Sequence, residues 1–264
     1  MKDFLIRIYK ISNSMGFDVL LFFGFLRQLP TFISEYFKLR KQLKNNNDFK
    51  LFINPLLSDK NKQNGTPYGH YFHQDFLIAR KIFENKPQKH LDIGSRVDGF
   101  VAHVAVFREI ECFDIRPQSN KMKNVIFKEA DLMQLPDELL NYCDSVSSLH
   151  AIEHFGLGRY NDNIDAFGHL KAFENIYNIL KAHGKFYYSC PMGVQRIEFN
   201  SHRVFSLNYL LNIFKEKFNI ISFNYVDDRG NLIENPELTI ESVKNSFNCK
   251  YGCAIFEMDK ISLL

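Results

Sequence analysis

Four short apolar runs between residues 89 and 154 constrain the fold more strongly than any other feature of the chain. Each run ends in, or leads directly into, polar residues, among them the carboxylates of Asp92, Asp114 and Asp131. In a parallel sheet the carboxyl ends of the strands lie along one edge, and ligands bind across that edge. The pattern therefore predicts a parallel sheet that holds a nucleotide-like cofactor at the ends of its strands.

Helix-like and strand-like segments alternate along most of the chain and are joined by short connections. We expect helices at 72–84, 99–108, 166–182 and 206–216, and strands at 89–93, 110–114, 124–128, 145–149, 185–190, near 219–226 and near 252–258. Such alternation gives right-handed crossovers and places helices on both faces of a mostly parallel sheet. The predicted fold class is α/β, doubly wound.

The beginning of the chain has a different pattern from the rest. Residues 1–45 predict two helices separated near Pro30, and a polar stretch at 51–68 predicts a loop. We therefore expect residues 1–68 to form an N-terminal helical extension and loop, and residues 69–264 to form the main domain.

An apolar run at residues 17–26 raises the question of a membrane segment. The run is too short to span a bilayer and contains Asp18, which argues against an integral membrane segment. Contact of this helix with a membrane surface remains open. The alternative is packing on the main domain or on a second copy of the chain, which would make the protein a homo-oligomer.

The net charge and the cysteines limit which partners and which cellular compartment are expected. The net charge of +3 is small for 264 residues, and the basic residues are spread among acidic ones. A nucleic-acid surface needs a concentrated basic patch, so we expect no nucleic-acid partner. The five cysteines form an odd set, and three lie in strand-like runs, which fits buried free thiols in a reducing, cytoplasmic environment.

The turn after the first predicted strand and the acids after the next two strands indicate a cofactor site. Gly94 and Gly99 lie in that turn, where missing side chains let the backbone approach a ligand. The dinucleotide fingerprint G-x-G-x-x-G is absent there, which argues against a nicotinamide cofactor. Asp114 follows Asp92 at roughly 20 residues, the spacing of a carboxylate that accepts hydrogen bonds from ribose. Asp131, after the third strand, can accept a bond from an adenine amino group. Each acid taken alone is better explained as a solvated strand-end residue or a turn cap, but together they favour an adenosine-containing cofactor.

These motifs resemble those of class I S-adenosylmethionine-dependent methyltransferases. The similar segments, within about residues 69–258, are Asp92-Ile93-Gly94-Ser95-Arg96-x-Asp98-Gly99-Phe100, Asp114-Ile115-Arg116-Pro117, the run from His150 to Tyr160, and Phe199-Asn200-x-His202-Arg203. They look like a little-characterised bacterial branch of the superfamily that accompanies surface-polysaccharide biosynthesis. The resemblance implies a seven-stranded Rossmann-like sheet with an antiparallel last strand, and S-adenosyl-L-methionine as the cofactor.

The resemblance also implies roles for individual residues. Asp92 and Gly94 would lie under the amino-acid part of the cofactor, Asp114 on its ribose, and Asp131 with Leu132 at its adenine. The complete set of expected cofactor residues is Asp92, Gly94, Ser95, Gly99, Asp114, Ile115, Arg116, Asp131, Leu132 and His150. Arg96 stands where the superfamily has a small residue, so it is expected to turn away or to reach the methionine carboxylate. The implied reaction is O-methylation of a sugar, sugar-linked or phosphorylated precursor of a capsule or lipopolysaccharide.

The segment after the fourth strand supplies candidate residues for the methyl acceptor. Histidine titrates near neutral pH, so we expect His154 to act as a general base supported by Glu153; strand-end histidines also serve simply as pocket walls. Arg159 and Arg203 can bind a phosphate or carboxylate, although an internal ion pair with Asp162 or Glu198 is an equally good interpretation. The remaining expected acceptor residues are Tyr160, His202 and His73. His73 belongs to a polar and aromatic cluster at 69–75 that either covers the cofactor or forms a plain helix face.

Two other functions compete with methyl transfer. The string His150-Ala151-Ile152-Glu153-His154 matches the H-x-x-E-H pattern of zinc hydrolases, but that pattern needs one continuous helix, and Gly156 and Gly158 follow at once. We therefore expect no metal among these residues. The second alternative is a non-catalytic, methyltransferase-like binding protein.

Overall fold

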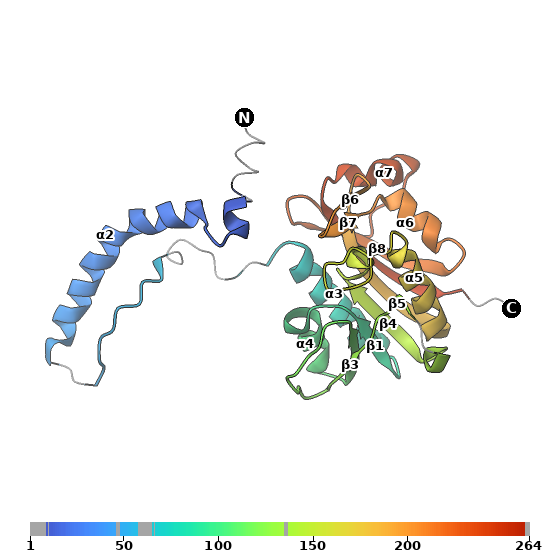
Figure 1. The fold of residues 1–264 in the computed structure, drawn as a ribbon, viewed down its shortest axis with the longest axis horizontal. Coiled ribbons are helices and arrows are strands. Elements are labelled where there is room, and N and C mark those ends of the chain that lie inside the picture. Colours follow the sequence, from blue (N-terminus) through green and yellow to red (C-terminus); the bar gives the residue numbers. More distant parts are fainter. Residues whose placement is uncertain are drawn as a thin grey trace. The chain divides into compact units, whose positions relative to one another are not determined.

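The computed structural model divides into two compact units, residues 1–66 and residues 67–264. It describes residues 9, 11–45, 48–57, 65, 67–134 and 137–261. The first unit contains one long helix, α2 (Val19–Gln42), followed by the short η1 (Leu43–Asn45) (Figure 1). The Asp18 carboxylate caps α2 by accepting hydrogen bonds from the first backbone N–H groups.

The prediction of two helices separated near Pro30 was wrong, because α2 continues through this proline. A proline inside a helix costs about 3 kcal/mol. In the described part of the chain, no helix has both the length and the apolar character needed to cross a membrane.

The second unit is built around an eight-stranded sheet with the order β3-β2-β1-β4-β5-β10-β8-β9. Its strands are β1 (His90–Ile93), β2 (Ile110–Asp114), β3 (Val125–Glu129), β4 (Cys143–Leu149), β5 (Leu180–Met192), β8 (Phe218–Val226), β9 (Leu232–Glu234) and β10 (Gly252–Lys260). Strands β1 to β5 pair in parallel, whereas β10 runs antiparallel to both β5 and β8. The predicted α/β class, the mostly parallel sheet and its antiparallel last strand are confirmed.

Three short strands were not predicted, and one of them, β9, gives the central sheet eight strands instead of the expected seven. Strand β9 pairs with β8 after a tight turn, in which the Asp227 carboxylate accepts hydrogen bonds from the backbone of Arg229 and Asn231. A separate hairpin is formed by β6 (Arg196–Glu198) and β7 (His202–Val204). Three residues are too few to show an alternating pattern in the sequence, which explains why these strands were missed.

Helices cover both faces of the sheet, as Figure 1 shows. They are α3 (His70–Asn85), η3 (Val97–Val101), α4 (Ala102–Ala105), η4 (Asp137–Leu139), η5 (Ile152–His154), α5 (Gly168–Ile179), α6 (Leu207–Phe214), α7 (Ile240–Asn245) and η6 (Ser246–Asn248). The helix expected at 99–108 is instead a π-helical turn, η3, that leads into the short α4. The helix expected at 166–182 ends at Ile179, and β5 begins at the next residue.

Alternate side chains of the central strands enter two separate hydrophobic clusters. Tyr187 of β5 and Ile255 of β10 pack on the side of α3 and α4, whereas Tyr188 and Phe256 pack on the side of α5 and α6. This is the two-residue alternation of a strand that is covered on both faces. Each large side chain buried in this way stabilises the fold by roughly 1.5–3 kcal/mol. The rigid sheet thus fixes the positions of the strand ends, where the polar residues lie.

Candidate functional site

A cavity of about 510 Å³ opens at the carboxyl ends of β1, β2 and β4, within the size range of small-molecule sites. The expected site residues that line it are Gly94, Asp114, Ile115, Arg116, Asp131, Leu132, His150, Glu153, His154, Arg159, Tyr160 and His202. Expected residues outside this lining are Asp92, Ser95, Gly99, His73 and Arg203. The structure thus brings most of the strand-end residues of both expected subsites to one cavity.

Asp92 lies beneath the cavity and organises the loop after β1. One carboxylate oxygen, Oδ1, accepts hydrogen bonds from the hydroxyls of Ser95 and Ser147, at 2.6 Å each, and Oδ2 accepts one from the Ser95 backbone at 3.0 Å. Ser95 Oγ in turn accepts a hydrogen bond from the backbone of Leu149. Burial raises the pKa of Asp92 to about 7. Asp92 and Ser95 therefore join the loop to β4 and do not face the open space.

Two glycines allow the loop to approach its neighbours closely. Gly94 has φ of +70°, and a Cβ there would lie 2.8 Å from the side chain of Ala151. A Cβ on Gly99 would lie 2.6 Å from a carboxylate oxygen of Asp75. Gly94 lines the cavity with bare backbone, whereas Gly99 serves the packing of η3 against α3.

Asp114 lies on the cavity wall at the end of β2 and is held by Arg116. Its oxygens accept hydrogen bonds from the Arg116 backbone at 2.8 Å, from Nε at 2.9 Å and from Nη2 at 2.6 Å. The Arg116 guanidinium also lies 4.4 Å from the ring centroid of Tyr160. On the next strand end, Asp131 accepts a hydrogen bond from the backbone of Met133. Both acids are thus fixed by neighbouring loop residues before any ligand binds.

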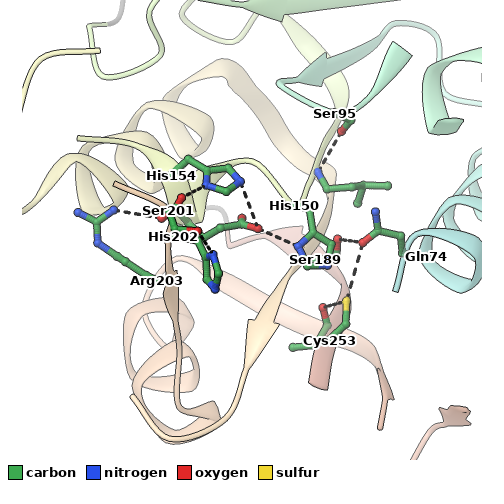
Figure 2. Close-up of polar contacts among 12 residues, drawn as sticks. Gln74, Ser95, His150, His154, Ser189, Ser201, His202, Arg203 and Cys253 are labelled. Atoms are coloured by element: carbon green, nitrogen blue, oxygen red, sulfur yellow. Dashed lines mark hydrogen bonds and ion pairs between the residues drawn. The ribbon is translucent and has the colours of Figure 1, made fainter. Parts of the chain in front are cut away.

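Glu153 is the centre of a polar wall on the other side of the cavity, and its side chain is only 1% exposed. Its Oε1 lies 2.8 Å from Nδ1 of His150 and 3.9 Å from Nε2 of His154 (Figure 2). Burial alone would raise the pKa of Glu153, but the two histidines lower it overall. Its Oε2 has no hydrogen-bond partner among the described residues. A buried carboxylate with a free oxygen is well suited to bind or orient a cationic or hydrogen-bonding group.

His154 is oriented by the backbone of the β6–β7 hairpin. Its Nδ1 lies 2.6 Å from the carbonyl oxygen of Ser201 and donates to it, so Nε2 carries the free lone pair. Burial lowers the pKa of His154, which keeps the ring neutral near pH 7. His202, on the same hairpin, bonds to the Ser201 hydroxyl through Nδ1, and its buried Nε2 has no partner in the described chain. The wall therefore presents unpaired nitrogen atoms from the two rings.

The loop after η5 places Arg159 and Tyr160 at the cavity mouth. Asp162 holds this loop by accepting hydrogen bonds from the backbone N–H groups of Gly156, Gly158 and Tyr160. The Arg159 guanidinium lies 3.3 Å from the carbonyl oxygen of Ser201. The Asp162 carboxylate thus serves the loop backbone, and the ion pair described for Glu198 is with Arg196.

Arg203 differs from the sequence expectation, because it is buried and faces backbone rather than the cavity. Its guanidinium donates to the carbonyl of Phe155 at 2.6 Å and to that of Ala166 at 3.2 Å. These bonds join β7 to the loop around η5. Arg203 therefore supports the wall from behind rather than binding a ligand in the cavity.

Sequence reasoning missed several residues of the cavity. Tyr71 comes from the cluster at 69–75 in place of the expected His73, and Tyr251 precedes β10. Ser201, Phe113 and Met133 also line the cavity. Arg96 lines it as well, although its guanidinium is paired with the exposed Asp98. The H-x-x-E-H string does not form a zinc-hydrolase helix, because η5 contains only Ile152–His154.

Comparison with solved structures finds proteins with a similar fold. The [4+2]-cyclase SpnF is 14% identical, with a TM-score of 0.51 over 72% of this chain and 82% of its own. A methyltransferase from Burkholderia thailandensis, 1,6-didemethyltoxoflavin-N1-methyltransferase with bound 1,6-didemethyltoxoflavin and S-adenosylhomocysteine, is 12% identical, with a TM-score of 0.51 over 91% of this chain and 89% of its own. At these identities the similarity shows that the Rossmann-like methyltransferase fold is shared, and it shows nothing further.

Comparison with curated protein sequences finds no match. One family model, described as "Caenorhabditis protein of unknown function, DUF268", matches residues 106–251. The matched segment extends from the loop before β2 to the start of β10 and includes the polar wall of the cavity. Because it covers more than half of the chain, the protein belongs to the DUF268 family.

Proposed function

We propose that this protein is an S-adenosylmethionine-dependent methyltransferase. The observation that carries the proposal is the cavity at the carboxyl ends of β1, β2 and β4, with Asp114 and Asp131 fixed on one wall. The shared fold supports it, as does the methyltransferase relative whose structure contains S-adenosylhomocysteine. In this proposal Asp114 accepts hydrogen bonds from the ribose, Asp131 and Leu132 contact the adenine, and Gly94 offers backbone to the amino-acid part.

The polar wall would bind the methyl acceptor. When bound, S-adenosylmethionine supplies an electrophilic methyl group on its sulfur. His154, whose Nδ1 faces the Ser201 carbonyl and whose pKa is lowered by burial, would take the proton of an acceptor hydroxyl at Nε2. Most of the rate would come from holding the two reactants in line. Arg159, Tyr160 and His202 border the remaining space and would position the acceptor.

The proposed acceptor is an oxygen of a sugar, sugar-linked or phosphorylated precursor of a surface glycan. Arg159 at the cavity mouth gives a cationic group for a phosphate, and the buried histidines give hydrogen-bond partners for hydroxyls. A cytoplasmic location fits the five cysteines, all free thiols. Incubation with candidate nucleotide sugars and detection of a mass gain of one methyl group tests this finer assignment.

Calorimetry with S-adenosylmethionine and S-adenosylhomocysteine tests the cofactor. The variant Asp114→Asn keeps the shape of the side chain but removes its charge, and a hydrogen bond to a charged group contributes about 1.5–3 kcal/mol. We therefore expect affinity to fall at least about tenfold. The matched control is Asp144→Asn, because Asp144 accepts two backbone hydrogen bonds at the opposite end of β4 and does not line the cavity. Absence of binding by the folded wild type would favour a non-catalytic, methyltransferase-like protein.

A further inference from the structure

Three side chains with metal-binding atoms meet beside the cavity, although they are far apart in the sequence. They are His70 at the start of α3, His150 after β4, and Cys253 in β10, and one ligand atom of each lies within 4.8 Å of the others. Within the described residues, this is the one group of three such side chains found this close together. It differs from the H-x-x-E-H string, because it shares only His150 with that motif.

His150 has the hydrogen bonding of a metal ligand. Its Nδ1 is bonded to the Glu153 carboxylate at 2.8 Å, and its buried Nε2 has no partner among the described residues (Figure 2). A histidine that binds metal through one nitrogen typically donates its other N–H to a carboxylate or a backbone carbonyl. With its proton on Nδ1, His150 presents the Nε2 lone pair. The side chain is about nine-tenths buried, so water does not readily satisfy this atom.

His70 supplies the second imidazole of the cluster. Its ring packs between those of His150 and Tyr251. An imidazole binds metal in its neutral form, through a nitrogen lone pair.

Ring stacking is the competing explanation of this cluster. The rings of His70 and His150 are stacked with centroids 5.2 Å apart, and His70 also stacks on Tyr251 at 5.4 Å. Stacking accounts for the ring planes but leaves Nε2 of His150 without a partner among the described residues, whereas buried polar atoms normally have one. The thiol of Cys253 adds a third metal-binding atom to the two rings, and its sulfur lies 3.8 Å from Oε1 of Gln74 and 3.5 Å from the Ala254 carbonyl.

We propose that His70, His150 and Cys253 bind one zinc ion, with Glu153 positioning His150. Two imidazoles and one thiolate form a borderline-soft donor set that suits zinc, and three protein ligands leave a fourth position for water or a ligand. Binding replaces the Cys253 thiol proton, which leaves to solvent. The thiolate and the Glu153 carboxylate together balance the two positive charges of the ion in this buried place. The proposal does not depend on methyl transfer.

Metal analysis of the full-length protein tests the site. Wild type dialysed against zinc and then against metal-free buffer is expected to retain about one zinc per chain, measured by mass spectrometry of the metal. Replacement of the metal by Co²⁺ should give a sulfur-to-cobalt charge-transfer band in the near ultraviolet. The variants Cys253→Ser and His70→Gln should each weaken zinc binding at least tenfold, and Cys253→Ser should remove the charge-transfer band. Glu153→Gln should weaken binding by about 10- to 100-fold with all three ligands present.

The matched control is Cys190→Ser, because Cys190 is equally buried on the neighbouring strand β5 and lies opposite Ala254 in the sheet. It should retain both the zinc and the charge-transfer band. If Cys253→Ser does not fold, the half-buried His70 at the helix start provides the independent variant. Wild type without zinc and without the cobalt band would overturn the proposal, as would zinc that survives both ligand variants. Calorimetry with S-adenosylmethionine separates this outcome from failure of the proposed function.

Discussion

Replacement of Asp92 by Asn should change the way in which stability depends on pH. Asp92 is fully buried, and burial raises its pKa from the ordinary 3.8 to about 7 in the folded protein. The folded state therefore binds a proton that the unfolded chain releases at lower pH. Because folding is favoured where the folded state binds more protons, this stabilisation is complete below about pH 4 and is lost as pH rises towards about 7.

The magnitude follows from the two pKa values. A difference from 3.8 to about 7 corresponds to roughly 4 kcal/mol in total, of which roughly 3 kcal/mol is lost between pH 5 and pH 8. Asn keeps an oxygen for the hydroxyls of Ser95 and Ser147 but places an NH₂ group against the Ser95 backbone N–H. That lost hydrogen bond costs about 1–3 kcal/mol at every pH. Asp92→Asn should therefore be less stable than wild type at pH 5 and as stable or more stable at pH 8.

Urea unfolding of both proteins at intervals from pH 5 to pH 9 measures this effect. The informative quantity is the difference between their free energies of unfolding, because titration of groups common to both proteins cancels. Asp75, whose pKa burial raises to about 6, is an example of such a group. Parallel pH profiles for the two proteins would show that Asp92 is already ionised in the folded state, and the reasoning from burial would then be refuted.

Three further outcomes are expected. His154→Gln should lower single-turnover methyl transfer by about 10²- to 10⁴-fold with unchanged cofactor affinity by calorimetry; equal loss of both would assign it to the pocket wall. Arg203→Met should lower the urea-unfolding free energy by about 1–3 kcal/mol for each carbonyl left without its donor, and an effect confined to acceptor KM would contradict its structural role. Gly156→Ala should strongly lower the free energy of unfolding, because Gly156 has φ of +76° and a Cβ there would overlap the Asp165 carbonyl. The control is Gly24→Ala, because Gly24 has open space around it.

The carboxyl ends of the strands could be predicted from the sequence because each carries its own local signal. Asp114 and Asp131 follow apolar runs, and parallel strands bring their ends to one edge whatever the details of packing. Asp92 carried the same signal but lies beneath the cavity, since the hydroxyls of Ser95 and Ser147 enclose its carboxylate. Whether a strand-end acid faces a ligand or a neighbouring loop depends on contacts that a single sequence does not display.

Residues brought in by distant elements could not be predicted. Tyr251 and Ser201 reach the cavity from the approach to β10 and from the β6–β7 hairpin, whose strands of three residues have no recognisable period. Arg203 is the opposite case, because it was expected in the cavity and does not line it. A charged residue in an exposed-looking motif suggested anion binding, yet β7 buries it against the carbonyls of another loop. Chain order gives no information on such long-range contacts.

The fold does not by itself choose the chemistry, since one protein of this fold is named as a cyclase and another as a methyltransferase. The side chains of the polar wall must therefore determine which reaction occurs. Within this wall, Glu153 lies closer to one histidine than to the other. Its carboxylate is 2.8 Å from His150 but 3.9 Å from His154, whose ring is set instead by the Ser201 carbonyl. The proposed base, His154, is therefore oriented mainly by the β6–β7 hairpin. Glu153 mainly orients His150. A loss of Glu153 should consequently affect the His150 side of the wall, where zinc is proposed, more than the proton transfer at His154.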